Sequence, residues 1–142
     1  MKEIKGDIWD YYDKGNWIVI TTNGDVRKDG ACVMGRGIAL QAKLRFPELP
    51  YRLGKLLKEF GNSINYLWPY RIIAFPVKSH WRGKANLRLI ERSCEDLLFS
   101  RKDYKGSIYM VRPGCGNGGL DWDGVKSILE KYLDDRFVVV SK

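Results

Sequence analysis

The sequence has few of the residues that build metal centres or disulfide frameworks. It contains one histidine, His80, and three cysteines, Cys32, Cys94 and Cys115, without Cys-x-x-Cys spacing. An odd number of widely separated cysteines indicates neither a disulfide framework nor a zinc site, and a single histidine excludes a histidine-based metal cluster. We therefore expect a protein that holds no metal.

Long apolar runs are absent as well. The N-terminal segment MKEIKGDIWD has no apolar stretch like that of a secretory signal, and no run approaches the length of a membrane span. Hydrophobic residues make up 44% and charged residues 30% of the 142 residues, which is ordinary for a folded protein. We expect a single domain, residues 1–142, that is cytoplasmic, monomeric and without a membrane partner.

Acidic residues are the minority among the charged ones. Lysine and arginine total 25 against 17 aspartates and glutamates, so the formal net charge is +8. This excess favours anionic partners, of which nucleic acid is the usual one. Charge alone does not separate a nucleic-acid binder from a protein that is merely basic, so particular motifs must decide.

Strand-like and helix-like patterns alternate along the chain. Runs of β-favouring residues occur at 17–20, 71–75, 107–111 and 137–140. Apolar residues at helical spacing occur at 37–46, 53–60, 87–98 and 125–132. Pro47, Gly61 and Pro76 act as stop signals, so we expect the strand at 71–75 to end at Pro76. The alternation predicts an α/β protein, a three-layer α/β/α sandwich around a mixed, largely parallel sheet.

Two glycine-rich segments, Cys32–Leu40 and Pro113–Trp122, each join a strand-like run to a helix-like one. Glycine at such a junction lets backbone N–H groups face an anion, and a helix N-terminus adds partial positive charge. In folds of this kind, ligands bind beyond the carboxyl ends of the strands, where both segments should lie. The pair predicts a ligand with two phosphates, or with a phosphate flanked by sugars.

Two common nucleotide-binding folds do not fit. Gly114, Gly116 and Gly119 satisfy Gly-x-Gly-x-x-Gly, but a dinucleotide fold needs an acidic residue near the end of the next strand. That strand runs through Val140 into Ser141 and carries no acid there. The Gly-Lys-Ser/Thr ending of a P-loop is absent too, so a dinucleotide-dependent dehydrogenase and a P-loop NTPase are excluded.

The arrangement instead resembles the macrodomain family, α/β/α modules that bind ADP-ribose, over essentially the whole chain. Gly6-Asp7-Ile8 resembles the family's Gly-Asp-Ile motif, whose acid binds the adenine amino group, and the strand that ends at Asn23 resembles its second strand. Three blocks, Val33–Gln41, Phe75–Lys84 and Gly114–Trp122, are similar to DarG-type antitoxin macrodomains. Those belong with the terminal ADP-ribose glycohydrolase branch and remove ADP-ribose from DNA bases.

The resemblance implies roles for particular residues. It places ADP-ribose at Asp7, Ile8, Asn23, Met34, Gly35, Arg36, Gly37, Ile38, Gly114, Cys115, Gly116, Asn117, Gly118 and Gly119. It makes Lys78 the catalytic residue, because in that branch a lysine just beyond the central strand acts as nucleophile or electrostatic helper at the distal ribose. A lysine at a stiff strand end with apolar neighbours suits this role, since partial desolvation favours the free, attacking amine.

The segment after Lys78 mixes cations with an indole. His80, Trp81, Arg82 and Lys84 form a predicted nucleic-acid contact, in which cations meet phosphates and the indole stacks on a base. The alternative is that Trp81 covers the core as a lid, that the cations are solvated, and that His80 orients the substrate or bonds the loop backbone.

Some positions depart from the relatives or have two interpretations. Human-type relatives carry an acid near Gly118, whereas the DarG-type pattern has glycine there; Asp121 is expected to cap a helix rather than to replace that acid. Cys115 is expected beneath its loop as a small apolar residue. Asn23 either positions the distal ribose or caps a turn. The loop at 24–30 is long and is expected to expose its charged side chains, Asp25 among them.

Together these inferences predict a glycohydrolase that removes ADP-ribose from DNA bases without a cofactor, because backbone N–H groups already stabilise the diphosphate. Its partners would be ADP-ribosylated DNA and a cognate toxin, and an aromatic side chain near the C-terminal edge would stack on the adenine. Three alternatives remain: a non-catalytic ADP-ribose reader, an ADP-ribose 1″-phosphate phosphatase and a protein de-ADP-ribosylase.

Overall fold

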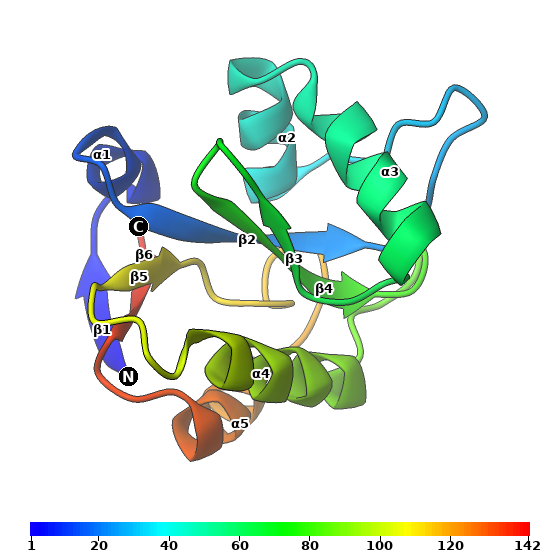
Figure 1. Cartoon of the computed structure of the whole chain (residues 1–142). Coiled ribbons are helices and arrows are strands. Elements are labelled where there is room, and N and C mark those ends of the chain that lie inside the picture. Colours follow the sequence, from blue (N-terminus) through cyan, green and yellow to red (C-terminus); the bar gives the residue numbers. More distant parts are fainter.

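Strands and helices alternate along the chain, and the computed structural model describes all of it, residues 1–142 (Figure 1). The strands are β1 (Lys2–Lys5), β2 (Trp17–Asn23), β3 (Asn65–Leu67), β4 (Ile72–Lys78), β5 (Ile108–Met110) and β6 (Phe137–Ser141). The helices are α1 (Ile8–Asp13), α2 (Gly37–Arg45), α3 (Leu49–Phe60), α4 (Leu87–Arg101) and α5 (Trp122–Tyr132).

The strands form one six-stranded sheet in the order β1-β6-β5-β2-β4-β3. Neighbouring strands are parallel except for β3, which pairs antiparallel with β4 at one edge. Helices α1, α2 and α3 cover one face, and α4 and α5 cover the other (Figure 1). The predicted three-layer sandwich with a mixed, largely parallel sheet is therefore confirmed.

Alternation along the buried strands supplies both layers of core. In β2, Ile18 and Ile20 face α1–α3, whereas Val19 faces α4 and α5. In β4, Phe75 and Val77 face α4 and α5. Since successive side chains of a strand point to opposite faces, one apolar run stabilises two helix layers, at about 1.5–3 kcal/mol for each large side chain fully buried.

Two differences from the sequence prediction have physical reasons. The sequence patterns of apolar residues do not predict β1, α1 and β3, because each of these elements is short. Strand β1, for example, carries one apolar residue, Ile4, and joins the sheet through backbone pairing with β6. Strand β4 does not end at Pro76 but continues to Lys78. Antiparallel β3 pairs with β4 only as far as Ala74, so Pro76 lies beyond the end of that ladder, and its carbonyl accepts a hydrogen bond from the Ser93 hydroxyl (2.9 Å).

The pairing of β2 with β4 contains a β-bulge at its carboxyl end. Thr22 pairs with Pro76, but Asn23 pairs with Lys78, so the register shifts by one residue. The bulge brings Asn23 and Lys78 opposite each other at the edge where parallel strands end. None of the helices combines the length and the apolar character needed to cross a membrane.

Candidate active site

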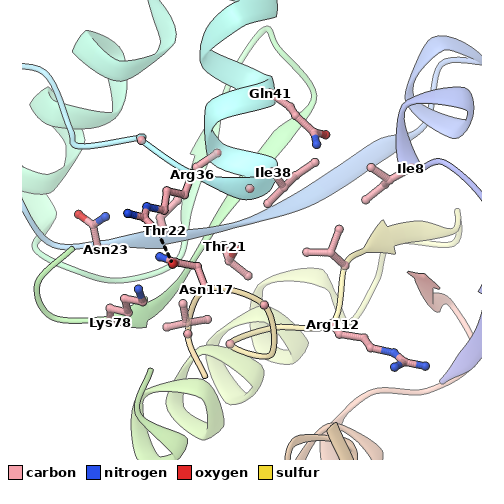
Figure 2. A pocket seen from close by; sticks show the side chains of 18 of the residues that line it. Ile8, Thr21, Thr22, Asn23, Arg36, Ile38, Gln41, Lys78, Arg112 and Asn117 are labelled. Carbon is pink, nitrogen blue, oxygen red and sulfur yellow. Dashed lines mark hydrogen bonds between the residues drawn. The ribbon is translucent and has the colours of Figure 1, made fainter. Parts of the chain in front are cut away.

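A cavity of about 290 Å³ lies beyond the carboxyl ends of β2, β4, β5 and β6, where the two glycine-rich segments meet (Figure 2). Parallel strands end at one edge of the sheet, which is why residues far apart in sequence share this cavity. The residues expected from the sequence that line it are Asp7, Ile8, Asn23, Gly35, Arg36, Gly37, Ile38, Lys78, Trp81, Gly114, Gly116, Asn117 and Gly118.

The first glycine-rich segment presents the N-terminus of α2 to the cavity. Arg36 is the N-cap residue, but its side chain does not cap, and the first turn has no acidic residue. The backbone N–H groups of Gly37, Ile38 and Ala39 have no intramolecular acceptor. Unpaired N–H groups at a helix N-terminus, with the positive end of the helix dipole, form a site for an anion.

The second glycine-rich segment is a tight turn. The amide of Gly119 donates to the carbonyl of Gly116 (3.2 Å), and the amide of Leu120 donates to the carbonyl of Gly114 (2.9 Å). The N–H groups of Asn117 and Gly118, between them, have no intramolecular acceptor. A Cβ atom at Gly118 would lie 2.5 Å from the Gly114 carbonyl oxygen. The turn therefore has no room for the acid that human-type relatives carry near this position.

A side-chain contact joins the two loops across the cavity. Arg36 Nη1 donates a hydrogen bond of 3.2 Å to Asn117 Oδ1, drawn as the dashed line in Figure 2. Both side chains are exposed, so the contact lies on the solvent side of the cavity. The loops thus approach each other closely enough for one ligand to touch both.

Lys78 occupies one end of the cavity, beside Asn23 (Figure 2). Its side chain is buried, with 7% of the residue exposed, and it forms no ion pair. The Lys78 Nζ atom lies 3.4 Å from the carbonyl oxygen of Trp81. Burial of an ammonium group without a carboxylate partner is costly, and such groups are concentrated in functional sites.

Asn23 both lies at the cavity, where a ribose could contact it, and caps the turn that follows β2. It lines the cavity, and its amide also fastens the loop that follows β2. Asn23 Nδ2 donates to the carbonyl of Val33 (3.0 Å), and Asn23 Oδ1 accepts from the N–H of Asp25 (3.0 Å). Because one amide hydrogen and one oxygen lone pair remain, the turn does not exclude contact with a ligand.

Asp7 and Ile8 mark the other end of the cavity. Asp7 is the N-cap of α1, and its Oδ1 atom accepts from the N–H of Trp9 (3.0 Å). The sequence motifs assign no ligand role to several residues at the cavity wall, some of which lie inside those motifs: Gly6, Thr21, Thr22, Val33, Ala39, Gln41, Val77, Val111, Arg112, Val140 and Lys142. Two of them could have been predicted from the sequence. Gln41 lies one helical turn after Gly37, and Arg112 lies just beyond the end of a strand. The cavity wall contains one aromatic side chain, Trp81, and that residue lies beside Lys78.

Three predicted ligand residues lie outside the cavity wall, and their roles stay predictions. Met34 is 2% exposed and packs in the core beneath α1–α3, and Gly119 closes the second loop with a positive φ of 75°. Cys115 packs against the other core, and burial raises the pKa of its thiol. Burial also raises the pKa values of Cys32 and Cys94 to about 12. A raised pKa leaves little thiolate, which fits a packing role for these cysteines.

The cationic segment lies at the rim. Trp81 is 42% exposed and is not a lid over the core, while the Arg82 guanidinium lies 4.8 Å from the centre of its indole ring. His80, Arg82 and Lys84 are exposed and do not line the cavity. Asp121 is the N-cap residue of α5, as expected, although its side chain forms no capping hydrogen bond. No group of three or more His, Cys, Asp or Glu side chains is placed to hold a metal ion.

A mixed sheet between two helix layers, with two glycine loops that meet over one cavity, is the architecture of a macrodomain. No protein-family model matches the chain. A DNA ADP-ribosyl glycohydrolase of Mycobacterium tuberculosis is 37% identical over 107 residues, which cover 68% of this chain and 30% of that relative. The solved macrodomain of Mycobacterium tuberculosis DarG is 30% identical with a TM-score of 0.72, and the match covers 89% of each chain.

The chain belongs to the DarG macrodomain family. A structure described as Thermosipho africanus DarTG in complex with ADP-ribose shares the fold, with a TM-score of 0.78 at 19% identity; the match covers all of this chain and 42% of that one. The chain spans 30% of the length of the mycobacterial DNA ADP-ribosyl glycohydrolase that it matches.

Proposed function

We propose that this chain is a DNA ADP-ribosyl glycohydrolase, which binds ADP-ribose attached to a DNA base and releases the unmodified base. The observation that carries the proposal is the buried amino group of Lys78, which has no carboxylate partner, at one end of a cavity whose loops present free backbone N–H groups. The names of the mycobacterial relative and of the Thermosipho africanus complex support this activity and this ligand.

In the proposed complex the ligand lies along the cavity. The free N–H groups of Gly37, Asn117 and Gly118 bind the diphosphate from both loops. The carboxylate of Asp7 keeps Oδ2 available for the adenine amino group, because Oδ1 is occupied by Trp9. The adenine then lies at the Ile8 end, and the distal ribose lies at the Asn23 and Lys78 end (Figure 2).

The proposed reaction takes place at C1″ of the distal ribose. The free amine of Lys78 attacks C1″, so that a C1″–Nζ bond forms while the bond from C1″ to the base breaks. The base leaves with the electron pair and takes up the proton that Nζ releases when the C1″–Nζ bond forms. Water then replaces Nζ at C1″, which releases ADP-ribose and restores the lysine. Backbone N–H groups stabilise the diphosphate throughout, so no cofactor enters the scheme.

The proposed substrate also has a nucleic-acid part. The modified base leaves the cavity beside Trp81, where the exposed cations Arg82 and Lys84 and the exposed imidazole of His80 can meet phosphates. A transferase that attaches ADP-ribose to DNA must supply this substrate, so a cognate toxin of that class is the proposed partner. A cytoplasmic location remains a prediction, with which three free cysteines are consistent.

The first prediction concerns Lys78→Ala. Single-turnover release of ADP-ribose from an ADP-ribosylated oligonucleotide should fall about a hundredfold or more, because the attacking amine is lost. The dissociation constant of free ADP-ribose should change little, since the loops bind the diphosphate. Lys28→Ala, an exposed cation in the loop after β2, is the matched control and should keep the wild-type rate.

The same assay separates the alternatives. Lys78→Ala at the wild-type rate would remove the lysine mechanism. Wild-type protein that binds ADP-ribose but releases nothing would be a reader. Turnover confined to ADP-ribose 1″-phosphate or to an ADP-ribosylated protein would instead show a phosphatase or a protein de-ADP-ribosylase.

A further inference from the structure

Beyond the carboxyl ends of β2 and β4, two loop segments continue side by side. Residues 24–33 follow β2, and residues 79–84 follow β4 and carry Trp81. The amide of Gly24 donates to the carbonyl of Ser79 (3.1 Å). A Cβ atom at position 24 would lie 2.9 Å from that carbonyl oxygen, so the approach requires glycine. The two loops are thus in backbone contact at the residues that directly follow Asn23 and Lys78.

Asp25 connects these loops with both of its carboxylate oxygens. Its Oδ1 atom lies 3.0 Å from His80 Nδ1, and its Oδ2 atom accepts from the N–H of Trp81 (2.8 Å). The side chain is half-buried, with 26% exposed, which differs from the exposed position expected from the sequence. The hydrogen bonds from His80 and Trp81 lower the pKa of Asp25, so the carboxylate is ionised at neutral pH.

Few other contacts hold the segment that Asp25 binds. Within residues 80–83, the one other backbone hydrogen bond is the local turn from Gly83 N–H to the carbonyl of His80 (3.0 Å). The Asp25 carboxylate is therefore the main contact that fixes the backbone of Trp81. That backbone matters for Lys78, because the Trp81 carbonyl is the hydrogen-bond acceptor of Lys78 Nζ at 3.4 Å.

We propose that Asp25 is a positioning residue, which fixes His80 and Trp81 and thereby places the Lys78 amine and the Trp81 indole relative to the distal ribose and its base. Asp25 does not line the cavity, so it acts through Trp81 and not on the ligand. The inference rests on the proposed function, in which Lys78 attacks C1″. A misplacement of about 1 Å at a reacting group is enough to cost a large factor in rate.

The test compares Asp25→Ala, Asp25→Asn and the matched control Asp29→Asn. Asp29 lies in the same loop, and its Oδ1 accepts from the N–H of Ala31 (3.1 Å), an acceptor that asparagine keeps. Asp25→Ala should lower kcat on the ADP-ribosylated oligonucleotide about tenfold or more, with KM within about twofold. Asp25→Asn should recover part of that loss, because its one oxygen can still accept from Trp81. Asp29→Asn should match wild type.

A second measurement tests the contact without using activity. Amide hydrogen exchange of Trp81 should be faster in Asp25→Ala than in wild type and unchanged in Asp29→Asn, because one hydrogen bond protects that amide. Unchanged exchange, or wild-type kcat in Asp25→Ala, overturns the inference and leaves the proposed function standing. An equal loss of kcat in Asp29→Asn also overturns it. Wild-type protein without turnover overturns the proposed function itself.

Discussion

Single residues decide both the shape and the chemistry of this cavity. Lys78 supplies a buried amino group, and Gly118 is a position at which no side chain fits without a clash. A loop that excludes an acid at Gly118 is consistent with the proposal that Lys78 is the reactive group. The glycine of the DarG-type pattern and the lack of space at Gly118 both support this proposal.

The second prediction is made at this scale, for Gly118→Asp. Its Cβ atom would clash with the Gly114 carbonyl oxygen at 2.5 Å and with Ala85 Cβ at 2.8 Å, so the loop must distort. We expect a loss of about 1–3 kcal/mol in the free energy of unfolding, measured by denaturant titration, and no new hydrolytic activity.

Gly116→Ala is the control for that change, because no atom lies within 4 Å of a Cβ atom built there. It should unfold at nearly the wild-type denaturant concentration. Equal stability of Gly118→Asp and wild type would show that the loop can accommodate an acid after all.

At the scale of elements, the loop after β2 is held by its contact with α3. The backbone of Gly54 in α3 approaches this loop so closely that a Cβ atom would lie 1.9 Å from the Gly30 carbonyl oxygen. A second contact, from the N–H of Cys32 to the carbonyl of Pro50 (2.8 Å), joins the same two elements. The helix therefore fixes the loop that carries Asp25.

The third prediction compares two helical glycines. Gly54→Ala should lower the free energy of unfolding by about 1–3 kcal/mol, because backbone must move to admit the methyl group. Gly124→Ala in α5, where a Cβ atom meets nothing within 4 Å, should raise it by up to about 1 kcal/mol through helix propensity. Thermal or denaturant unfolding of both variants checks the pair, and a stabilising Gly54→Ala would contradict the contact with the loop.

Periodicity was sufficient to predict the long elements but not the short ones. Strand β2 and helix α4 carry enough apolar residues to show a period, whereas β1 and β3 are formed by pairing with neighbours that no local pattern reveals. The prediction that β4 ends at Pro76 was wrong. Whether a strand can continue through a proline depends on whether a neighbouring strand needs its N–H, and that is decided by the tertiary structure. The local sequence pattern predicts the long helices and strands, whereas the short strands and the strand ends depend on the neighbouring strands with which they pair.

The same limit applies to the site. The glycine loops and Lys78 could be identified because motifs place them in sequence. The role proposed for Asp25 could not, since its contacts with His80 and Trp81 span 55 and 56 positions. Contacts of that separation are made by the sheet, and a single sequence does not show them.

At the scale of the whole molecule, the net charge of +8 bears on binding to DNA. In the proposed complex, free ADP-ribose lies inside the cavity, whereas an oligonucleotide would also lie across the rim. Phosphate contacts at the rim release counterions, so the affinity for ADP-ribosylated DNA should fall with salt more steeply than that for free ADP-ribose.

The fourth prediction follows from that difference. Arg82→Ala and Lys84→Ala should each reduce the slope of log affinity against log salt by about one for the modified oligonucleotide. Neither change should alter the affinity for free ADP-ribose. Lys131→Ala in α5 is the control for loss of one exposed cation away from the rim, and a slope reduced equally by that change would show that the rim is not the contact.

The alternation of side chains along β4 has a consequence for how this domain can diverge. Phe75 and Val77 point to the α4–α5 core, and Lys78 points to the opposite face only because of its place in that alternation. Replacing one apolar residue of β4 by another leaves this parity intact. Inserting or deleting a single residue between Ile72 and Lys78 would turn the amine into the core, unless a second bulge absorbed the change. The count of residues in β4 is therefore under tighter constraint than their identity.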